Sequence, residues 1–296
     1  MRGASRNFKL SEALMRRLLP ALCLGALCFS HTASAQTVTS VGVATTGAAA
    51  GASTDAAELA KQLSNPVASL IAVPFQYNYN EGFGADGDGS QSYVNIQPVI
   101  PISIGANWNV ISRTIVPVVW QDGIVPDEGS QFGLGNTLQS LFLSPKKPTA
   151  SGLIWGVGPA IQFPTATDGI SPNQWGLGVT AVGLKQKDGW TFGALANQVW
   201  TVTGNSRYGE QSNAFLQPFL SYTTPKATSF TLNTESTYNW NAEEWSVPIN
   251  FMVGQIVKIG KQPVQFTLGA RYWADAPEFG PEGWGGRFQV ALLFPK

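Results

Sequence analysis

The stretch Trp284-Gly-Gly-Arg-Phe-Gln-Val-Ala-Leu-Leu-Phe294 alternates between two kinds of side chain. One set of alternate positions is aromatic at both ends and aliphatic between them. The other set carries an arginine, a glutamine and small residues. Because successive side chains of a β-strand point to opposite faces, the pattern predicts a strand with one apolar and one mixed face. About eleven residues suffice for a tilted strand to cross an outer membrane, and aromatic residues are typical of both membrane interfaces.

The same pattern returns about every 19 residues from residue 70 onward, separated by segments rich in Gly, Asp, Asn or Pro. The predicted strands are roughly 71–80, 93–104, 106–119, 132–143, 152–163, 174–186, 189–202, 213–223, 227–239, 246–259, 262–273 and 284–294. We therefore predict an all-β fold: a transmembrane antiparallel up-and-down β-barrel of about 12 strands over residues 67–296. The strands at 106–119, 132–143 and 213–223 break the alternation, which indicates bulges or errors in the assigned register there.

The connections between these strands alternate in length and charge. With the N-terminus on the periplasmic side, the predicted external loops are mostly longer and hold nearly all the acidic loop residues. The predicted periplasmic turns instead carry lysines, such as Lys146, Lys187 and Lys261. A wrong strand count would have mixed the two sets, so the separation supports an even number of strands.

Proline argues against a regular barrel. Seven prolines fall inside predicted strands, where a residue without an N–H group cannot donate to the ladder: Pro74, Pro98, Pro101, Pro117, Pro159, Pro218 and Pro248. We expect bulges, kinks or strand ends at these positions. A soluble all-β sandwich is the alternative fold.

The N-terminus has the features of an export signal. Residues 1–35 combine a basic start, an apolar core at 18–30 and the sequence Ala33-Ser-Ala35 before a cleavage point. We interpret 36–54 as a flexible leader and 55–66 as a short periplasmic helix that Pro66 ends. Two roles stay open for the helix: a plug or cap on the barrel, or a simple lead into the first strand.

Cleavage of this signal would remove most chemistry that proteins use at catalytic and metal sites. Both cysteines and the only histidine lie within residues 1–35, so the mature chain would offer no thiolate or imidazole ligand and no Ser-His pair. We expect no enzyme activity, no cofactor and no metal site. The mature chain would hold 13 basic and 17 acidic residues, and this balance gives no reason to expect nucleic-acid binding.

The remaining polar side chains are those predicted to face the barrel interior. They form the candidate solute path: Gln76, Asn78, Asn95, Gln97, Asn109, Arg113, Gln162, Asn233, Glu235, Arg271, Arg287 and Gln289. Three arginines and one glutamate among amides suit either of two roles. They can line a path for a solute, or they can fill a narrow lumen with ion pairs.

One region resembles a known family. The residues are Gly133-Leu-Gly-Asn-Thr-Leu-Gln-Ser-Leu-Phe-Leu-Ser-Pro145, Gly156-Val-Gly-Pro159 and Ile161-Gln-Phe-Pro-Thr165. They resemble the outer-membrane transporters of the phenol-degradation meta-pathway type, a family often labelled "transporter" or "neuromedin U". The resemblance covers about residue 58 to the end. It implies an outer-membrane barrel that admits small hydrophobic or aromatic compounds, with strands interrupted by proline.

We therefore expect an outer-membrane channel for the uptake of small molecules, located in the outer membrane of a Gram-negative cell. The alternative is a barrel with a filled lumen and a structural or surface-binding role. Expected partners are outer-membrane lipid and lipopolysaccharide, an unidentified small solute and the barrel-assembly machinery. That machinery would recognise the last strand through four alternate residues: Phe288, Val290, Leu292 and Phe294.

Overall fold

The computed structural model describes residues 46–124, 129–204 and 209–295. The predicted signal peptide and the first part of the leader, residues 36–45, lie outside these ranges. The elements are α1 (Thr46–Leu63), β1 (Ile71–Phe83), β2 (Gly89–Ile96), β3 (Val99–Ile104), β4 (Trp108–Asp122), β5 (Gln131–Leu134), β6 (Thr137–Pro145), β7 (Leu153–Phe163), β8 (Gln174–Lys187), β9 (Trp190–Gly204), β10 (Ser212–Thr223), β11 (Thr228–Thr234), β12 (Ser236–Asn239), β13 (Glu244–Ile259), β14 (Gln262–Asp275) and β15 (Gly283–Phe294).

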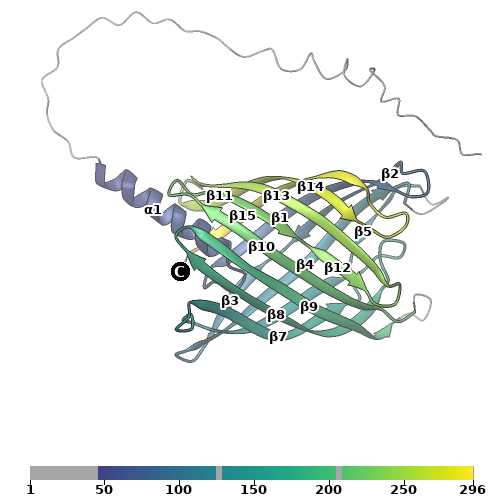
Figure 1. Ribbon diagram of the computed structural model, residues 1–296, viewed down its shortest axis with the longest axis horizontal. Helices are drawn as coiled ribbons and strands as arrows, with labels where there is room; N and C mark the ends of the chain where they lie inside the picture. The colour runs from purple at the N-terminus through teal and green to yellow at the C-terminus, as the bar shows by residue number, and fades with distance from the viewer. Residues whose placement is uncertain (1–45, 125–128, 205–208, 296) are drawn as a thin grey trace, which may run out of the picture. The chain divides into compact units, whose positions relative to one another are not determined.

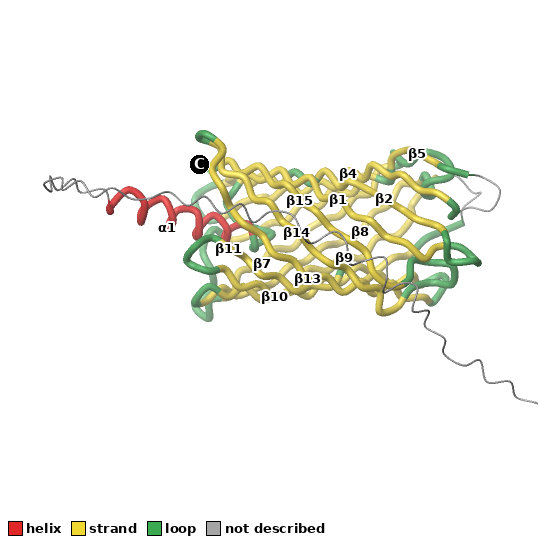
Figure 2. Tube along the Cα trace, turned by 90° about the horizontal axis from the view of Figure 1, so that it is seen from above, coloured by secondary structure: helices red, strands yellow, loops and turns green. Residues whose placement is uncertain are grey.

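The strand segments form a closed antiparallel barrel of twelve strands. Three pairs of segments, β2 with β3, β5 with β6 and β11 with β12, each make one interrupted strand, so the fifteen segments amount to twelve. Every strand pairs with its neighbours in sequence, and β15 closes the ring against β1, from Ile71 opposite Phe294 to Tyr79 opposite Gly286. Figures 1 and 2 show the tilted strands running around the wall. This arrangement confirms the predicted fold.

Proline explains the interruption between β2 and β3. The register on either side of the gap places Gln97 opposite Pro74 of β1 and Pro98 opposite Thr114 of β4. At these positions the prolines act only as hydrogen-bond acceptors. The Pro74 carbonyl accepts from the Gln97 N–H at 2.9 Å, and the Pro98 carbonyl accepts from the Thr114 N–H at 3.1 Å. Since proline has no N–H to donate, the regular ladder cannot continue through these positions.

The other irregularities only partly match the predicted ones. The strand predicted at 132–143 is interrupted between β5 and β6, where the Gly135 N–H donates to the Pro117 carbonyl at 3.0 Å. The irregularity predicted in 106–119 occurs on one side of β4 only, where the pairing shifts by one residue between Ile115–Leu138 of β6 and Val118–Leu134 of β5. In 213–223 the pairing of β10 with β9 is continuous, and the pairing with β11 and β12 is interrupted at Gln217 and Pro218 without a change of register. Further register shifts, which were not predicted, occur at Glu81/Phe83, Trp175/Gly176 and Val247/Pro248.

The outer surface of the barrel is apolar. Large side chains such as Leu268 and Phe251 are 69% and 52% exposed along the middle of their strands. Aromatic rings pair at both ends of the strands. At the end of the barrel where β15 begins these are Trp120–Phe132, Phe163–Trp175, Tyr238–Trp245 and Tyr272–Trp284, and at the end where β15 finishes Trp108–Trp155 and Trp190–Tyr222. An apolar band between two aromatic girdles is the surface that a lipid bilayer requires.

The helix is longer than the predicted segment 55–66. It begins at Thr46, inside the stretch interpreted as a flexible leader, and ends at Leu63. Residues 48–50 are consecutive alanines, which have the highest helix propensity, so the helical segment extends toward the N-terminus. Within the described ranges, no helix has both the length and the apolar character needed to cross a membrane. The helix lies at the end of the barrel where β15 finishes (Figure 1).

Candidate solute path

The twelve side chains predicted to line the path all point into the barrel. Seven of them are buried polar or charged residues: Gln76, Asn78, Gln97, Asn109, Asn233, Arg271 and Arg287. Asn95, Arg113, Glu235 and Gln289 line cavities of the interior, and Gln162 shares its strand face with the fully buried Ala160. The period of two along each strand therefore located the interior side chains.

Glu235 is the centre of the polar interior. Its carboxylate accepts two hydrogen bonds from Arg287, from Nη1 at 2.9 Å and from Nη2 at 2.6 Å. It also accepts one from Arg271 Nη2 at 3.0 Å. Both arginine side chains are 1% exposed, whereas the glutamate side chain is 20% exposed. One partly accessible carboxylate thus holds two buried guanidinium groups.

Amide side chains satisfy the other donors of the two arginines. Arg287 Nε donates to Asn78 Oδ1 at 2.7 Å, and Arg271 Nε donates to Asn250 Oδ1 at 2.8 Å. The Asn250 amide in turn donates to Asn233 Oδ1 at 2.9 Å. Because buried charges are stable only when both the charge and its remaining donors are satisfied, these amides fix the position of the cluster.

An aromatic and amide shell surrounds Arg271 on its other side. Arg271 Nη1 donates to Tyr93 Oη at 2.8 Å and to Asn80 Oδ1 at 3.4 Å. The guanidinium lies over the Trp273 ring, 5.6 Å from its centroid, and the indole N–H donates to Asn80 at 3.2 Å. Asn80, Tyr93, Asn250 and Trp273 were not among the predicted site residues. Asn80 and Tyr93 lie on the same strand faces as Asn78 and Asn95, so the alternation contained the signal for both.

The backbone around Glu235 is interrupted by two prolines on the neighbouring strands. The registers on both sides of the gap place Pro248 of β13 opposite Glu235, and Pro218 of β10 opposite Thr234. Neither proline can donate a ladder hydrogen bond. The central carboxylate of the interior therefore lies at the gap between β11 and β12.

Two cavities adjoin this cluster. The first, called the inner cavity, has a volume of about 230 Å³; Glu235, Arg287 and Arg113 line it on one side and the end of α1 on the other. The second, the outer cavity of about 370 Å³, is bordered by Tyr93 and Trp273 near the longer loops. The cavities share no lining residue. Glu235 and Arg287 line the inner cavity, and Arg271, which is bonded to Glu235, contacts Tyr93 and Trp273 of the outer cavity. The cluster thus forms a constriction between them.

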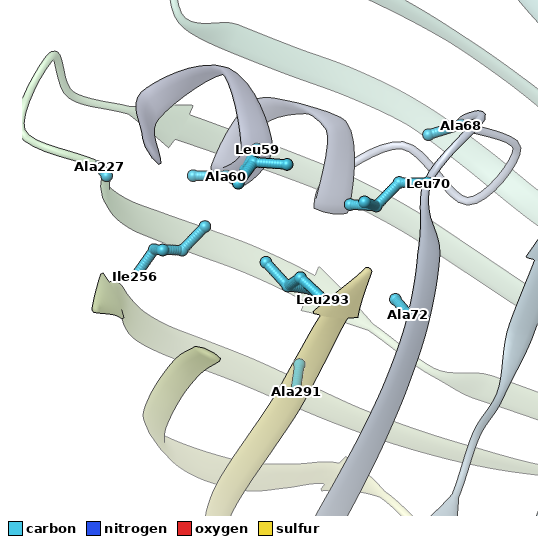
Figure 3. Packing of buried hydrophobic residues seen from close by; sticks show 9 residues of the cluster. All are labelled: Leu59, Ala60, Ala68, Leu70, Ala72, Ala227, Ile256, Ala291 and Leu293. Atoms are coloured by element: carbon cyan, nitrogen blue, oxygen red, sulfur yellow. The ribbon is translucent and has the colours of Figure 1, made fainter. Parts of the chain in front are cut away.

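The end of α1 occupies the barrel interior beneath the inner cavity. Leu59 and Ala60 are buried against the inward side chains of Ile256 on β13 and Leu293 on β15 (Figure 3). The Gln186 side chain of β8 donates to the Lys61 carbonyl at 2.8 Å, from the other side of the barrel. The helix is therefore attached to several strands of the wall.

The segment after the helix continues across the interior. Val67 is 5% exposed and packs in a cluster with Ile111 of β4, Phe142 of β6 and Leu195 of β9. Ser69 accepts a hydrogen bond from Asn109 at 3.1 Å. Residues 59–70 contact both sides of the wall, so the helix fills this end of the lumen and does more than lead into β1.

Within 46–124, 129–204 and 209–295, no three His, Cys, Asp or Glu side chains come together as ligands.

The comparisons with known proteins agree with the fold. A crystal structure of an outer membrane channel from Pseudomonas putida F1 superposes with a TM-score of 0.60 at 13% identity, covering 76% of this chain and 96% of that one. Outer membrane phospholipase A from Escherichia coli has a TM-score of 0.45 at 12% identity, covering 82% and 98%. The β domain of the Bordetella autotransporter BrkA has a TM-score of 0.41 at 10% identity, covering 76% and 100%. No family model matches the chain, and no curated protein sequence matches it.

At 13% identity the first likeness establishes a shared barrel fold and carries no residue roles. The other two superpose too loosely to support an argument.

Proposed function

We propose that this protein is an outer-membrane channel through which small molecules pass between the outer and inner cavities. The observation that carries the proposal is the pair of cavities on either side of the Arg271–Glu235–Arg287 constriction, inside a wall whose outer surface is apolar. Charged and amide side chains at a narrow point are the elements with which channels select solutes.

Reconstitution of the mature chain, residues 36–296, into planar bilayers tests this function directly. We expect discrete steps of current, and liposomes carrying the protein should swell in a small neutral sugar faster than protein-free liposomes. Absence of both conductance and solute flux would contradict the channel. Heat-modifiable migration on a gel establishes beforehand that the barrel is folded.

The proposed location is the outer membrane. The apolar band between aromatic girdles and the fold shared with an outer membrane channel support it. Cell fractionation tests the location, and recovery in the soluble periplasm would contradict it. Lipopolysaccharide around the wall and the assembly machinery at β15 are the partners that this location implies.

The proposed solutes are small hydrophobic or aromatic compounds. This class follows from the resemblance of residues 133–165 to transporters of the phenol-degradation meta-pathway type. Phe83, Tyr93 and Trp273 around the outer cavity supply the aromatic surface that such compounds would contact. Uptake of radiolabelled phenol into cells with and without the protein tests the class. Equal uptake would refute it.

A barrel with a filled lumen is the second candidate. The buried arginines and the helix residues beneath the inner cavity favour it, because both occupy space that a solute would need. Under this alternative the reconstituted protein would fold into the bilayer and give no current.

A further inference from the structure

The charges of the barrel interior do not balance. Arg271 and Arg287 share the carboxylate of Glu235, and Arg113 on β4 adds another positive charge beside the inner cavity. Three arginines and one glutamate leave a net charge of +2 in this region. A cleft with charge of one sign and walls of low dielectric constant concentrates ions of the opposite sign. The inner cavity therefore favours anions.

Arg113 differs from the other two arginines in its contacts. Its Nη2 donates to Gln97 Oε1 at 3.1 Å. In the described part of the chain, no carboxylate lies within 4.0 Å of its guanidinium, and Glu235 interacts with it only at longer range. A guanidinium has five N–H donors in a planar fork. Arg113 is half-buried and lines the inner cavity, so donors remain for a ligand there.

The rest of the inner cavity is divided between amides and apolar side chains. Gln76 and Gln289 hydrogen-bond to each other at 3.2 Å on one part of its surface. Leu195, Phe219 and Met252 contribute an apolar part. Such a lining suits a molecule with one charged end and a short hydrocarbon body.

We propose that the inner cavity binds a small carboxylate with a short apolar body, held by the guanidinium of Arg113, and that the channel consequently prefers anions to cations. The selectivity rests on the proposed channel function, whereas the binding does not. A planar guanidinium pairs with a carboxylate through two parallel hydrogen bonds, and rings of arginine are the usual selectivity element of anion pores. Arg271 and Arg287 cannot take this role, because Glu235 and the amides already engage their donors.

The first experiment uses butyrate and its neutral isostere butyramide as probes. In planar bilayers under a KCl gradient, we expect the reversal potential to shift toward the chloride equilibrium potential. Millimolar butyrate should reduce the chloride current at least twofold, and the same concentration of butyramide should leave it unchanged. Calorimetric titration of the detergent-solubilised protein with each probe measures binding without any need for conductance.

Three variants separate the role of Arg113 from general effects of charge and folding. Arg113→Gln should abolish the difference between butyrate and butyramide and move the reversal potential toward zero. Arg113→Lys keeps the charge but loses the planar fork, so anion preference should persist while butyrate binding weakens about tenfold, equivalent to about 1.4 kcal/mol. Lys226→Gln removes an exposed charge in the turn at 224–227 and should change neither property.

The outcomes distinguish this inference from the proposed function. A conducting protein that prefers cations, or that responds equally to butyrate and butyramide, would overturn the inference and leave the channel intact. A protein that binds butyrate through Arg113 but carries no current would overturn the channel and the selectivity and retain the site. If Arg113→Gln does not fold, two measurements still test the binding site: the comparison of butyrate with butyramide on the wild type, and butyrate binding by Arg113→Lys.

Discussion

Glu235 and Arg287 form a bidentate ion pair, with Nη1–Oε1 at 2.9 Å and Nη2–Oε2 at 2.6 Å, although two whole strands separate the residues in the wall. Glu235 lies at the gap between β11 and β12, Arg287 lies on β15, and β13 and β14 run between them. The contact therefore spans the curved interior of the barrel rather than a pair of adjacent strands. It joins strands that are not neighbours in the wall.

Replacement of Glu235 by Gln should lower the unfolding free energy by about 3 kcal/mol, since it leaves two buried guanidinium groups without a counter-charge. Urea titration of the refolded barrel, followed by tryptophan fluorescence, measures the change. Glu244→Gln, an exposed carboxylate at the start of β13, is the matched control and should shift the value by less than about 0.5 kcal/mol. Equal losses in the two variants would contradict the buried ion-pair cluster.

A double-mutant cycle of Arg287→Ala and Glu235→Ala should reveal a coupling free energy on the order of 1–3 kcal/mol, because the two residues share direct hydrogen bonds. The same unfolding measurement on the wild type, the two single variants and the double variant supplies the four free energies of the cycle. Additive single effects would show that the ion pair contributes nothing beyond its separate parts.

Replacement of Arg271 by Ala should change both stability and flux. The loss removes the donors to Asn80, Tyr93 and Asn250 and also widens the constriction, so a lower melting temperature and a higher single-channel conductance are expected together. Lower stability with unchanged conductance would assign Arg271 to packing alone and favour the filled-lumen alternative.

Deletion of residues 46–66 should raise the single-channel conductance several-fold, because Leu59 and Ala60 close the end of the lumen beneath the inner cavity. Bilayer recording compares the deletion with Lys61→Ala. This control retains the backbone carbonyl that Gln186 binds and should behave as wild type. Unchanged conductance in the deletion would mean that the helix does not obstruct the path.

Deletion of residues 290–296 should prevent membrane assembly more severely than deletion of the loop at 240–243. Residues 290–294 pair with β1 on one side and, as far as Leu292, with β14 on the other, so their loss exposes two strand edges at the closure of the barrel. The yield of heat-modifiable protein in the outer membrane is the measurement. Normal assembly of the truncated chain would refute the role proposed for Val290, Leu292 and Phe294.

Local alternation was enough to predict the strands and their inward faces. The period of two in Trp284–Phe294 and in the segments before it separates apolar from polar side chains, and only a closed barrel places such strands in lipid. Proline was correctly identified as one source of irregularity, at the gap between β2 and β3 and at the gap between β11 and β12. The shifts at Glu81/Phe83 and Trp175/Gly176 involve no proline, and Pro101 of β3 and Pro159 of β7 pair without interruption. Proline lacks the N–H that other residues donate to the ladder. Whether it interrupts the ladder depends on whether that N–H would have pointed at a carbonyl of the neighbouring strand.

Sequence by itself determined the class of fold and the approximate number of strands, because both follow from the alternation of side chains along each strand and its repetition along the chain. It also determined which arginines and amides face inward. Only the tertiary structure decided that Glu235 joins Arg271 and Arg287 while Arg113 keeps donors for the inner cavity, and that the end of the helix occupies one end of the lumen. Those contacts cross the barrel, so they depend on strand register and curvature, which no local pattern encodes.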